Sequence, residues 1–404
     1  MQKLLKEELV RIKLSEKESS KLKKSTSEIV EKLKRALKNV NAQIFIGGSL
    51  AKGTIIRKEV PDVDIFIRFY YIRDISKLPN IIRKARLKAV KIHGSRDYFQ
   101  IKEKNVIYEI VPVLRIAKPE DAVNVTDLSY FHVNYVIDAI NKNPKLADDI
   151  ILAKSFTHAS ECYGAESYIK GFSGYALELL VINYGGFIEL VKAISKTKSK
   201  LILDPGKKYK NKIDILNNLN ESKLGSPIVF IDPTFAERNA LAALSDESFS
   251  KFREYCTAFL KKPSKKFFEQ TKIDKKKYNL IVKAVTDRQE GDVAGSKLIK
   301  FYKFLLSNLG IYFEVKDAIF YYNEKKHAEY YFDLKAKKEL IMEGPPIKME
   351  ESVKKFKEAH KKTFVKNGKI CSREKININY KKFLAEFKKK YKIQMNEMGI
   401  TRVS

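Results

Sequence analysis

The chain has 404 residues, of which 80 are Lys or Arg and 49 are Asp or Glu, so its net charge is +31 and its isoelectric point is near 9.7. With 44% apolar residues it can bury a sizeable core, and at roughly 100–200 residues per domain its length predicts two to four domains. A charge so far from zero indicates a polyanionic partner, such as nucleic acid or an acidic membrane surface.

The apolar stretches and the cysteine spacing exclude several classes of protein. The longest uncharged apolar stretch in the middle of the chain lies between Glu178 and Glu189 and holds ten residues, whereas a membrane span needs about 20. The N-terminal residues alternate in charge and lack the apolar core of a signal peptide. The three cysteines are odd in number and widely spaced, so they predict neither a disulfide framework nor a zinc site. We expect a soluble, reduced, cytoplasmic protein with no membrane partner.

The positive charge is concentrated at the two ends of the chain. Residues 1–100 carry +13, residues 101–250 carry −1 and residues 251–404 carry +19. General enrichment in Lys would spread the charge evenly, although it remains an alternative explanation for any single Lys cluster. The C-terminal excess therefore favours a region that binds a polyanion.

The first 140 residues predict strands with flanking helices, an α+β or α/β module. Ser25 and Glu28 have the spacing of a capping box, and apolar residues from Ile29 to Val40 recur at helical spacing. A further helix is predicted over 83–90. Strands are predicted over 43–46, 63–69, 98–101 and 106–114, the last with its extended part ending at Pro112.

In the rest of the chain the predicted secondary structure changes twice. From 134 to 259 the pattern is mostly helical, and Ser173 is a candidate cap for a helix over 175–184. Within this part a basic loop is predicted over 196–212 and a helix over 238–244. Farther on, a small sheet is predicted from 311–313, 318–322 and 329–334, a linker at 344–346, and basic helices over 350–363 and 380–392.

The first chemical signal is the Gly47-Gly48-Ser49 turn, which leads to Lys52. A Gly-Ser turn that leaves a strand can bring backbone N–H groups and a hydroxyl against a phosphate, and glycine permits the close approach. Taken alone this turn is weak, because Gly-Gly-Ser is also common in loops that bind nothing.

Three carboxylates on predicted strands form the second signal. Asp62 and Asp64 are two residues apart in one strand, so they point to the same face. Two like charges held close are costly without a compensating cation, and a divalent metal removes that cost. A single Asp-x-Asp pair would be explained more simply by a sheet edge that faces solvent. Glu109, inside a second apolar strand, shifts the balance toward a metal site made of all three.

This combination resembles the nucleotidyltransferase superfamily that includes DNA polymerase beta and the poly(A) polymerases. The resemblance implies that Asp62, Asp64 and Glu109 are catalytic and hold two Mg²⁺ ions for in-line nucleotidyl transfer. One ion would lower the pKa of a 3′-hydroxyl, and the other would stabilise the pyrophosphate leaving group.

Over nearly the whole chain the sequence is similar to the archaeal (class I) CCA-adding tRNA nucleotidyltransferases. The resemblance implies template-independent addition of C, C and A to the acceptor end of tRNA from CTP and ATP. The segments that carry it are GGSLAKGT, PDVDIFIRF, YEIVPVLRI, TDLSYFH, LAKSFTHASECYGAESYIKGFSGYALELLVINYGGF, FIDPTFAERNALAALS, EGDVAGSKL and MEGPPIKM.

Nucleotide contacts follow from the same resemblance. Cationic and hydroxyl donors suit phosphate oxygens, and an Arg fork can distinguish the edges of C and A from those of G and U. Arg238 matches the arginine that reads the incoming base. Without the resemblance, packing or ion pairing would explain each residue. The residues that match triphosphate contacts are Gly48, Ser49, Lys52, His132, Lys154 and Tyr163.

The implied fold is α+β and multidomain. It would comprise a polymerase-beta-like catalytic head (1–140), a helical central domain that binds nucleotide (141–258), an α/β body (259–344) and a basic helical tail that binds tRNA (345–404). Candidates for contact with the tRNA backbone are Lys297, Lys388, Lys389 and Lys390, although a solvated helix face would also explain the last three. Members of the family often form homodimers, so the resemblance implies one here.

The sequence departs from the family pattern in four places, one of which is the segment Leu128-Ser129-Tyr130-Phe131, where an Arg-Thr-Pro-like stretch is usual. Glu109 stands where Asp is usual, Pro61 where Ser is usual, and Lys52 where Arg is common, so one guanidinium fork becomes a point charge. Two alternatives stay open: an oligo- or poly(A) polymerase of the same superfamily, and a catalytically inactive RNA-binding protein. The intact acidic residues argue against the second.

Overall fold

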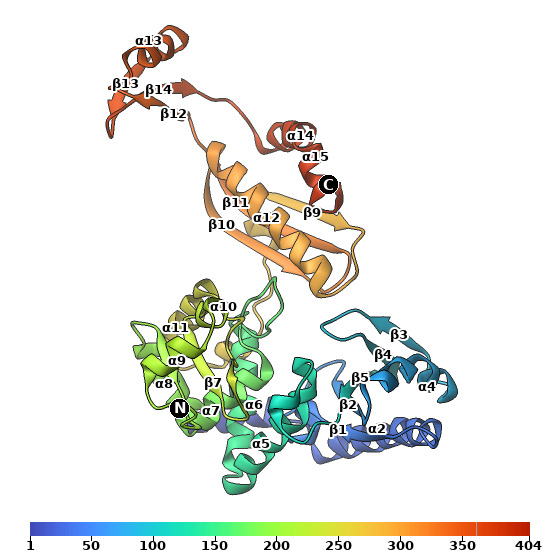
Figure 1. Cartoon of the computed structure of the whole chain (residues 1–404). Helices are drawn as coiled ribbons and strands as arrows, with labels where there is room; N and C mark the ends of the chain where they lie inside the picture. Colours follow the sequence, from blue (N-terminus) through green and yellow to red (C-terminus); the bar gives the residue numbers. More distant parts are fainter. Residues whose placement is uncertain (361) are drawn as a thin grey trace. The chain divides into compact units, whose positions relative to one another are not determined.

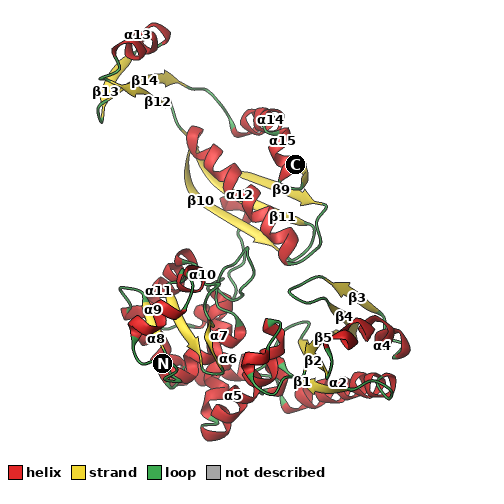
Figure 2. Ribbon diagram, viewed as in Figure 1, coloured by secondary structure: helices red, strands yellow, loops and turns green. Residues whose placement is uncertain are grey.

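The computed structural model describes residues 1–360 and 362–404, which form two compact units, 1–271 and 272–404 (Figure 1). Helices and sheets are mixed throughout both units (Figure 2), which confirms the predicted α+β class. None of the described helices combines the length and the apolar character needed to cross a bilayer. The predicted division into four parts stays a prediction, and each unit is described by itself.

The first unit opens with two helices, α1 (Gln2–Ile12) and α2 (Glu16–Ala36). Ser15 caps α2: its hydroxyl accepts from the Glu18 N–H, and the Glu18 carboxylate accepts from the Ser15 N–H. The capping box predicted at Ser25 is therefore wrong. Ser25 lies inside α2, because the helix begins at Glu16, nearly three turns before the start that a cap at Ser25 predicts.

A five-stranded sheet follows, in the order β1-β2-β5-β4-β3. Strands β2 and β5 run parallel, and the other neighbours are antiparallel. The strands are β1 (Ala42–Ile46), β2 (Asp62–Phe69), β3 (Ala89–Ile92), β4 (Tyr98–Glu103) and β5 (Val106–Leu114), and the short helices between them are α3 (Gly48–Ala51), η1 (Ile72–Lys77) and α4 (Leu78–Lys84).

Two details of this sheet differ from the predictions. The helix predicted over 83–90 ends at Lys84, because Arg86 adopts a left-handed φ of 55° and the chain then enters β3. Strand β5 does not stop at Pro112 but continues to Leu114, in register with the end of β2.

The alternation of β2 decides what each face of the sheet carries. Val63, Ile65 and Ile67 are fully buried and belong to one core cluster with residues of α2. Residues 62, 64 and 66 point to the opposite face, where Phe66 packs with a few apolar side chains of β5. Asp62 and Asp64 therefore sit on the face that the α2 core does not cover.

The remainder of the first unit is mainly helical. Ser173 caps α7 as predicted, since its hydroxyl accepts from the Ala176 N–H. The elements are η2 (Pro119–Asp121), η3 (Val125–Leu128), α5 (Ser129–Lys142), α6 (Lys145–Ala159), α7 (Gly174–Tyr184), α8 (Phe187–Lys196), β6 (Leu201–Leu203), α9 (Lys212–Asn218), α10 (Glu221–Leu224), β7 (Ile228–Asp232), β8 (Phe235–Asn239), α11 (Asp246–Lys261) and η4 (Lys265–Phe268).

Two predictions in this segment are wrong. The basic loop predicted over 196–212 contains strand β6, which pairs in parallel with β7. The helix predicted over 238–244 is instead the end of β8 and a turn, because Asn239 pairs with Ile231 of β7 and its side chain bonds the backbone at Phe230 and Leu241. Helices α6 and α7 are buried almost all round, around an aromatic core that includes Phe156.

In the second unit an antiparallel sheet has the order β10-β11-β9-β15, with α12 and α14 packed on one face. The predicted strand over 311–313 is wrong, since α12 continues to Tyr312. The elements are η5 (Lys275–Lys277), β9 (Leu280–Thr286), α12 (Asp292–Tyr312), β10 (Phe313–Tyr322), β11 (His327–Ala336), β12 (Glu339–Pro346), α13 (Glu350–Ala359), β13 (Thr363–Lys366), β14 (Lys369–Lys375), α14 (Tyr380–Lys390), α15 (Lys392–Glu397) and β15 (Ile400–Val403).

The C-terminal segment is less helical than predicted. The expected linker at 344–346 lies within β12, which joins β14 and β13 in a three-stranded sheet. The last strand, β15, pairs with β9. Residues 345–404 therefore form helices, a hairpin and the final strand of the preceding sheet, because turn residues of the Gly-Pro kind also fit a sheet edge.

Candidate active site

The parallel pairing of β2 and β5 brings the three predicted carboxylates together on one sheet face. Asp64 is the register partner of Glu109, and Asp62 lies two residues before Asp64. Gln100 of β4 is the next partner across, and its Nε2 donates to Glu109 Oε1 at 3.4 Å. Strand register alone thus places Asp62, Asp64 and Glu109 side by side.

The charges around these carboxylates differ. Asp62 is exposed, and its Oδ2 lies 2.9 Å from Lys58 Nζ. Asp64 is half-buried; burial is the main cause that raises the pKa of its carboxyl, and the nearby Asp62 raises it further, while Lys52 and Lys154 lower it. Within 1–360 and 362–404, no group of three or more His, Cys, Asp or Glu side chains is gathered closely enough to hold a metal ion.

The donor chemistry nevertheless fits a divalent cation. Three carboxylates from adjacent strands are hard oxygen ligands of the kind that Mg²⁺ prefers. The half-buried Asp64 carries a charge that its surroundings disfavour, so a cation at this face would stabilise the ionised form. The side chains are neighbours by register and would have to converge around an ion.

The Gly-Ser loop covers Asp64 directly. Gly47 N–H donates to the Asp64 carbonyl at 2.9 Å, and Gly48 adopts a left-handed φ of 59°. A Cβ at Gly48 would lie 1.7 Å from Asp64 Oδ2, so only glycine lets the backbone approach this carboxylate so closely. Ser49 follows at the start of α3, and Thr54 N–H closes the loop by donating to the Ser49 carbonyl at 2.9 Å.

Two predicted triphosphate contacts, Lys52 and Lys154, meet at a shared carboxylate. Lys52 Nζ lies 2.6 Å from Glu178 Oε2, and Lys154 Nζ lies 2.9 Å from Glu178 Oε1. Lys154 also donates to Thr54 Oγ1 at 3.0 Å. Burial alone would raise the pKa of Glu178, but the two ammonium groups lower it to about 2. Ion pairs therefore join the Gly-Ser loop, which leads to Lys52, to α6 and α7.

Tyr163 lies beside these groups. Its ring stacks on His158 with the centroids 3.9 Å apart, and its hydroxyl is so near the start of α7 that a Cβ at Gly174 would lie 2.8 Å from it. Burial raises the pKa of Tyr163, and the negative charges of Glu178 and Asp64 raise it further. The phenol is therefore a neutral hydrogen-bond donor on the carboxylate side of the site.

A second buried carboxylate, Asp232, joins His132 to Arg238. Asp232 Oδ2 lies 3.1 Å from His132 Nε2 and 2.6 Å from Arg238 Nη1, and Oδ1 accepts from Tyr175 at 3.0 Å and from Thr234. His132 stacks on Tyr175 with the centroids 4.1 Å apart. Burial would raise the pKa of Asp232, but His132, Arg238 and Thr234 hold it well below its usual range.

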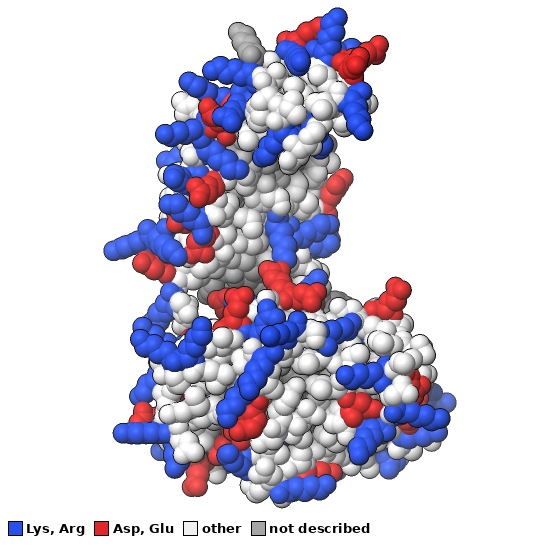
Figure 3. Space-filling model, turned by 90° about the vertical axis from the view of Figure 1, so that its left-hand side faces the viewer, with Lys and Arg blue, Asp and Glu red and all other residues white. Residues whose placement is uncertain are grey.

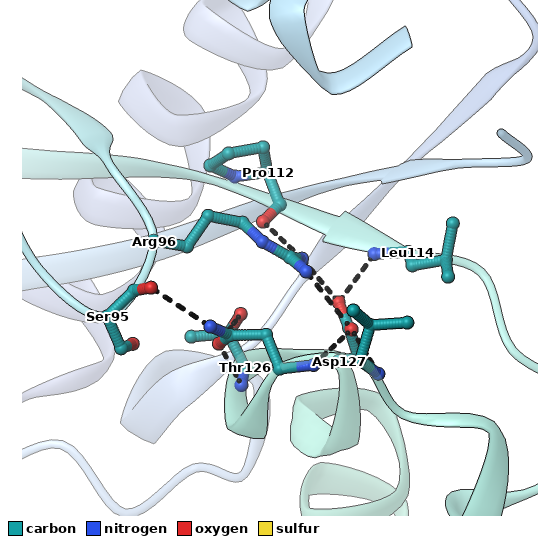
Figure 4. Close-up of polar contacts among 8 residues, drawn as sticks. Ser95, Arg96, Pro112, Leu114, Thr126 and Asp127 are labelled. Carbon is teal, nitrogen blue, oxygen red and sulfur yellow. Dashed lines mark hydrogen bonds and ion pairs between the residues drawn. The ribbon is translucent and has the colours of Figure 1, made fainter. Parts of the chain in front are cut away.

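Arg238 lines a cavity of about 450 Å³. One wall is the segment 122–128, and Asp127 fixes this segment by accepting from the Leu114, Val123 and Asn124 N–H groups and from both Nη atoms of Arg96 (Figure 4). The cavity wall is thus tied to the end of β5 by the Leu114 hydrogen bond and to the loop between β3 and β4 by a buried ion pair.

The predicted tRNA contacts lie in the second unit. Lys297 is half-buried on α12, and Lys388 at the end of α14 donates to the Val403 carbonyl at 3.4 Å. Lys389 and Lys390 are exposed. Helices α12 and α14 pack on each other through Phe301 and Phe387.

Sequence reasoning missed Glu178, Asp232 and Tyr175. A signal existed for the first, because Glu178 is the single charged residue in the apolar sequence of α7. Asp232 similarly ends the apolar strand β7. Neither pattern says which cations a buried carboxylate will meet, since the partners lie 24 to 126 residues away for Glu178.

Comparisons with known proteins find relatives of similar sequence. Residues 148–269 match the family described as tRNA nucleotidyltransferase, second domain. The chain is 42% identical to the CCA-adding enzyme of Nanoarchaeum equitans over 51% of this chain and 52% of the relative. It is 28% identical to that of Methanocaldococcus jannaschii (92% and 86%) and 33% identical to that of Sulfurisphaera tokodaii (66% and 61%). The match thus spans less than two thirds of the first and third relatives.

Solved structures share the fold at low sequence identity. A cytoplasmic RNA terminal U-transferase superposes with a TM-score of 0.53 at 14% identity, covering 67% of this chain and 98% of that one. The Cid1 terminal uridylyl transferase gives 0.51 at 13% identity, with the same coverage. The chain is thus similar in sequence to the archaeal CCA-adding enzymes, and its fold is that of the polymerase-beta-like nucleotidyltransferases.

Proposed function

We propose that the protein adds C, C and A, without a template, to the 3′ end of tRNA, using CTP and ATP. The observation that carries the proposal is the register of Asp62, Asp64 and Glu109 on one sheet face, directly beneath the Gly48 loop. The similarity to CCA-adding enzymes over most of the chain supports the choice of tRNA as substrate.

In the proposed reaction the 3′-hydroxyl oxygen of the RNA attacks the α-phosphorus of the nucleotide. The bond from this phosphorus to the bridging oxygen breaks, pyrophosphate leaves, and the hydroxyl proton passes to water. Positioning and charge neutralisation supply most of the acceleration in phosphoryl transfer. The residues proposed to bind and orient the triphosphate are Gly48, Ser49, Lys52, His132, Lys154 and Tyr163.

Divalent ions, proposed as two Mg²⁺ held by Asp62, Asp64 and Glu109, would lower the pKa of the attacking hydroxyl and neutralise charge on the leaving group when bound. The longer side chain of Glu109 reaches the same face as an Asp would, since its backbone is in register with Asp64. Gln100 restrains it from the other side.

Arg238 is proposed to read the base. Its guanidinium is held by Asp232 and borders the 450 Å³ cavity, so the remaining N–H groups have a fixed direction. A planar fork of donors suits an acceptor edge and rejects a donor edge. The ion pair through Asp232 also fixes His132, so the base and triphosphate contacts share one anchor.

Basic residues of the second unit are proposed to hold the tRNA backbone. Lys and Arg side chains are numerous on the face shown in Figure 3, interspersed with acidic ones. The exposed Lys389 and Lys390 suit phosphate contacts, whereas Lys297 and Lys388 are partly covered. A cytoplasmic location and a homodimer stay predictions, and light scattering of the purified protein tests the second.

The test supplies a tRNA transcript that lacks CCA with one nucleoside triphosphate at a time and Mg²⁺. Two C additions with CTP alone, and one further A once ATP is present, are expected. Long A or U tails would instead indicate another terminal transferase of the superfamily, and no extension at all would indicate an inactive RNA-binding protein. An Asp64→Asn variant should give no extension, which separates the activity from a contaminant.

A further inference from the structure

Glu178 is a fully buried carboxylate in the middle of an apolar helix. Its side chain has no exposed surface, and its neighbours in α7 form the core of the first unit. An ionised group buried without partners costs several kcal/mol. Such a residue in this place therefore needs a reason that packing does not give.

The two carboxylate oxygens are divided between two lysines. Oε2 accepts from Lys52 at 2.6 Å, and Oε1 accepts from Lys154 at 2.9 Å and from the Thr54 hydroxyl at 3.3 Å. The lysine side chains are themselves almost wholly covered, with 8% and 5% of their surface exposed. Three groups thus meet from the head loop, from α6 and from α7.

The charges of this set do not cancel. Two ammonium groups and one carboxylate leave a net charge of +1 on these three side chains, which are covered from solvent. They lie near Asp64, whose pKa both lysines lower. A triphosphate is the ligand that such a surplus fits, because charge-assisted hydrogen bonds to phosphate are stronger in a covered site than in water.

We propose that Glu178 is a positioning residue for nucleotide binding, which holds Lys52 and Lys154 in place and keeps them charged toward the triphosphate. The proposal rests on the proposed function, since it assumes that the nucleotide binds at the Gly48 loop. Glu178 itself makes no contact with the substrate in this scheme. Its carboxylate acts through the two lysines.

The protonation of Lys154 makes the proposal testable. Burial lowers the pKa of Lys154, and the carboxylate of Glu178 raises it again. The other charged groups that face Lys154 are Lys52 and Lys58 from the head loop and Asp64 from β2; His158 lies on its own helix. Since two of these are further cations, loss of the Glu178 charge should let Lys154 lose its proton at a lower pH.

The experiment measures binding of CTP and of CMP by calorimetry, without tRNA, from pH 6 to pH 9. The variant Glu178→Gln keeps the shape and removes the charge. Its CTP affinity should fall about 10-fold or more at pH 9, the size expected for one lost charge-assisted hydrogen bond, and should recover toward pH 6 as Lys154 is protonated. Wild-type affinity should vary much less, and CMP binding should change little in either protein.

A second variant distinguishes the proposed role from a general loss of folding. Glu178→Asp retains the charge but is one methylene too short to reach both lysines, so it should weaken CTP binding and keep the wild-type pH profile. The matched control is Asp149→Asn, a largely covered carboxylate of α6 whose nearest cation is Lys145 at 4.0 Å. The control should bind CTP as the wild type does.

Several results would overturn the proposal. One is wild-type CTP affinity and pH profile in a folded Glu178→Gln protein, or wild-type affinity in Glu178→Asp. Another is an equal loss for CTP and CMP, which would indicate a structural role alone. If the wild-type protein bound no CTP, the proposed function would fail together with the inference, whereas a CTP-binding wild type isolates the role of Glu178.

Discussion

The contact between Gly48 and Asp64 makes the sharpest prediction about catalysis. In Gly48→Ala the new Cβ would lie 1.7 Å from Asp64 Oδ2, where ordinary contacts begin near 3.4 Å. The loop or the carboxylate must therefore shift by more than 1.5 Å. A misplacement of about 1 Å costs roughly 100-fold in rate, so we expect nucleotide addition to fall at least about 100-fold.

The same substitution also carries a backbone cost. Gly48 has a φ of 59°, and a left-handed conformation costs a non-glycine residue about 1–2 kcal/mol. Gly53 is the matched control, because its φ is 66° and a Cβ there would meet nothing within 4 Å. Both variants should lose this backbone contribution to the free energy of unfolding in urea, and Gly48→Ala should lose more because of its clash with Asp64.

The assay is incorporation of CTP into a tRNA transcript that lacks CCA, at saturating Mg²⁺. Gly48→Ala should be nearly inactive, and Gly53→Ala should stay within about threefold of the wild type, since only the first touches Asp64. Equal activity in the two variants would refute the reasoning. A loss as large in Gly53→Ala would mean that loop stiffness, and not the position of Asp64, limits the reaction.

Three further predictions follow from buried charges and exposed ones. Asp232→Asn should release Arg238 and weaken the preference for CTP and ATP over GTP and UTP by about 10-fold. Because the pKa of Asp232 is lower in the folded protein than in the unfolded chain, the carboxylate should contribute fully to the free energy of unfolding above the unfolded pKa of about 4. Urea unfolding should show this contribution shrinking as the pH falls below that value. Arg96→Ala should lower the free energy of unfolding by about 3 kcal/mol, because it leaves the buried Asp127 carboxylate with backbone N–H donors but without a cation; a loss below about 1 kcal/mol would contradict this role of the ion pair drawn in Figure 4. Lys389→Ala should raise the KM for tRNA and reduce the salt dependence of binding by about one unit of slope, with the KM for CTP unchanged; an altered KM for CTP would speak against a backbone contact.

The sheet of the head could be predicted because its signals are local. Alternation from Val63 to Phe69 identified β2, and the same alternation put Asp62 and Asp64 on one face. The register that brings Glu109 beside Asp64 is not local, however: it comes from a parallel pairing across more than 40 residues. Spacing suggested that the third carboxylate belonged with the pair, and only the fold supplied the reason.

Local sequence patterns gave the wrong secondary structure where the same residues are compatible with a helix, a strand end or a turn. The turn at Arg86 divides a stretch that looks helical throughout, and a left-handed φ at a non-glycine residue has no sequence signal. The segment after Arg238 looks helical, but side-chain bonds of Asn239 to two backbone N–H groups hold it as a strand end and turn. In both places tertiary contacts outweigh helix propensity.

Two shared carboxylates show why the site cannot be divided between the predicted parts of the chain. Asp62, Asp64 and Glu109 lie within 1–140, but Glu178 and Asp232 come from 141–258 and hold donors from both sides of that boundary: Lys52 of the head with Lys154, and His132 of α5 with Arg238. Without residues 1–140, Glu178 would keep Lys154 but lose Lys52, and Asp232 would keep Arg238 but lose His132. The ion pairs therefore cross the predicted boundary near residue 140, since Lys52 and His132 of the first part are held by carboxylates of the second.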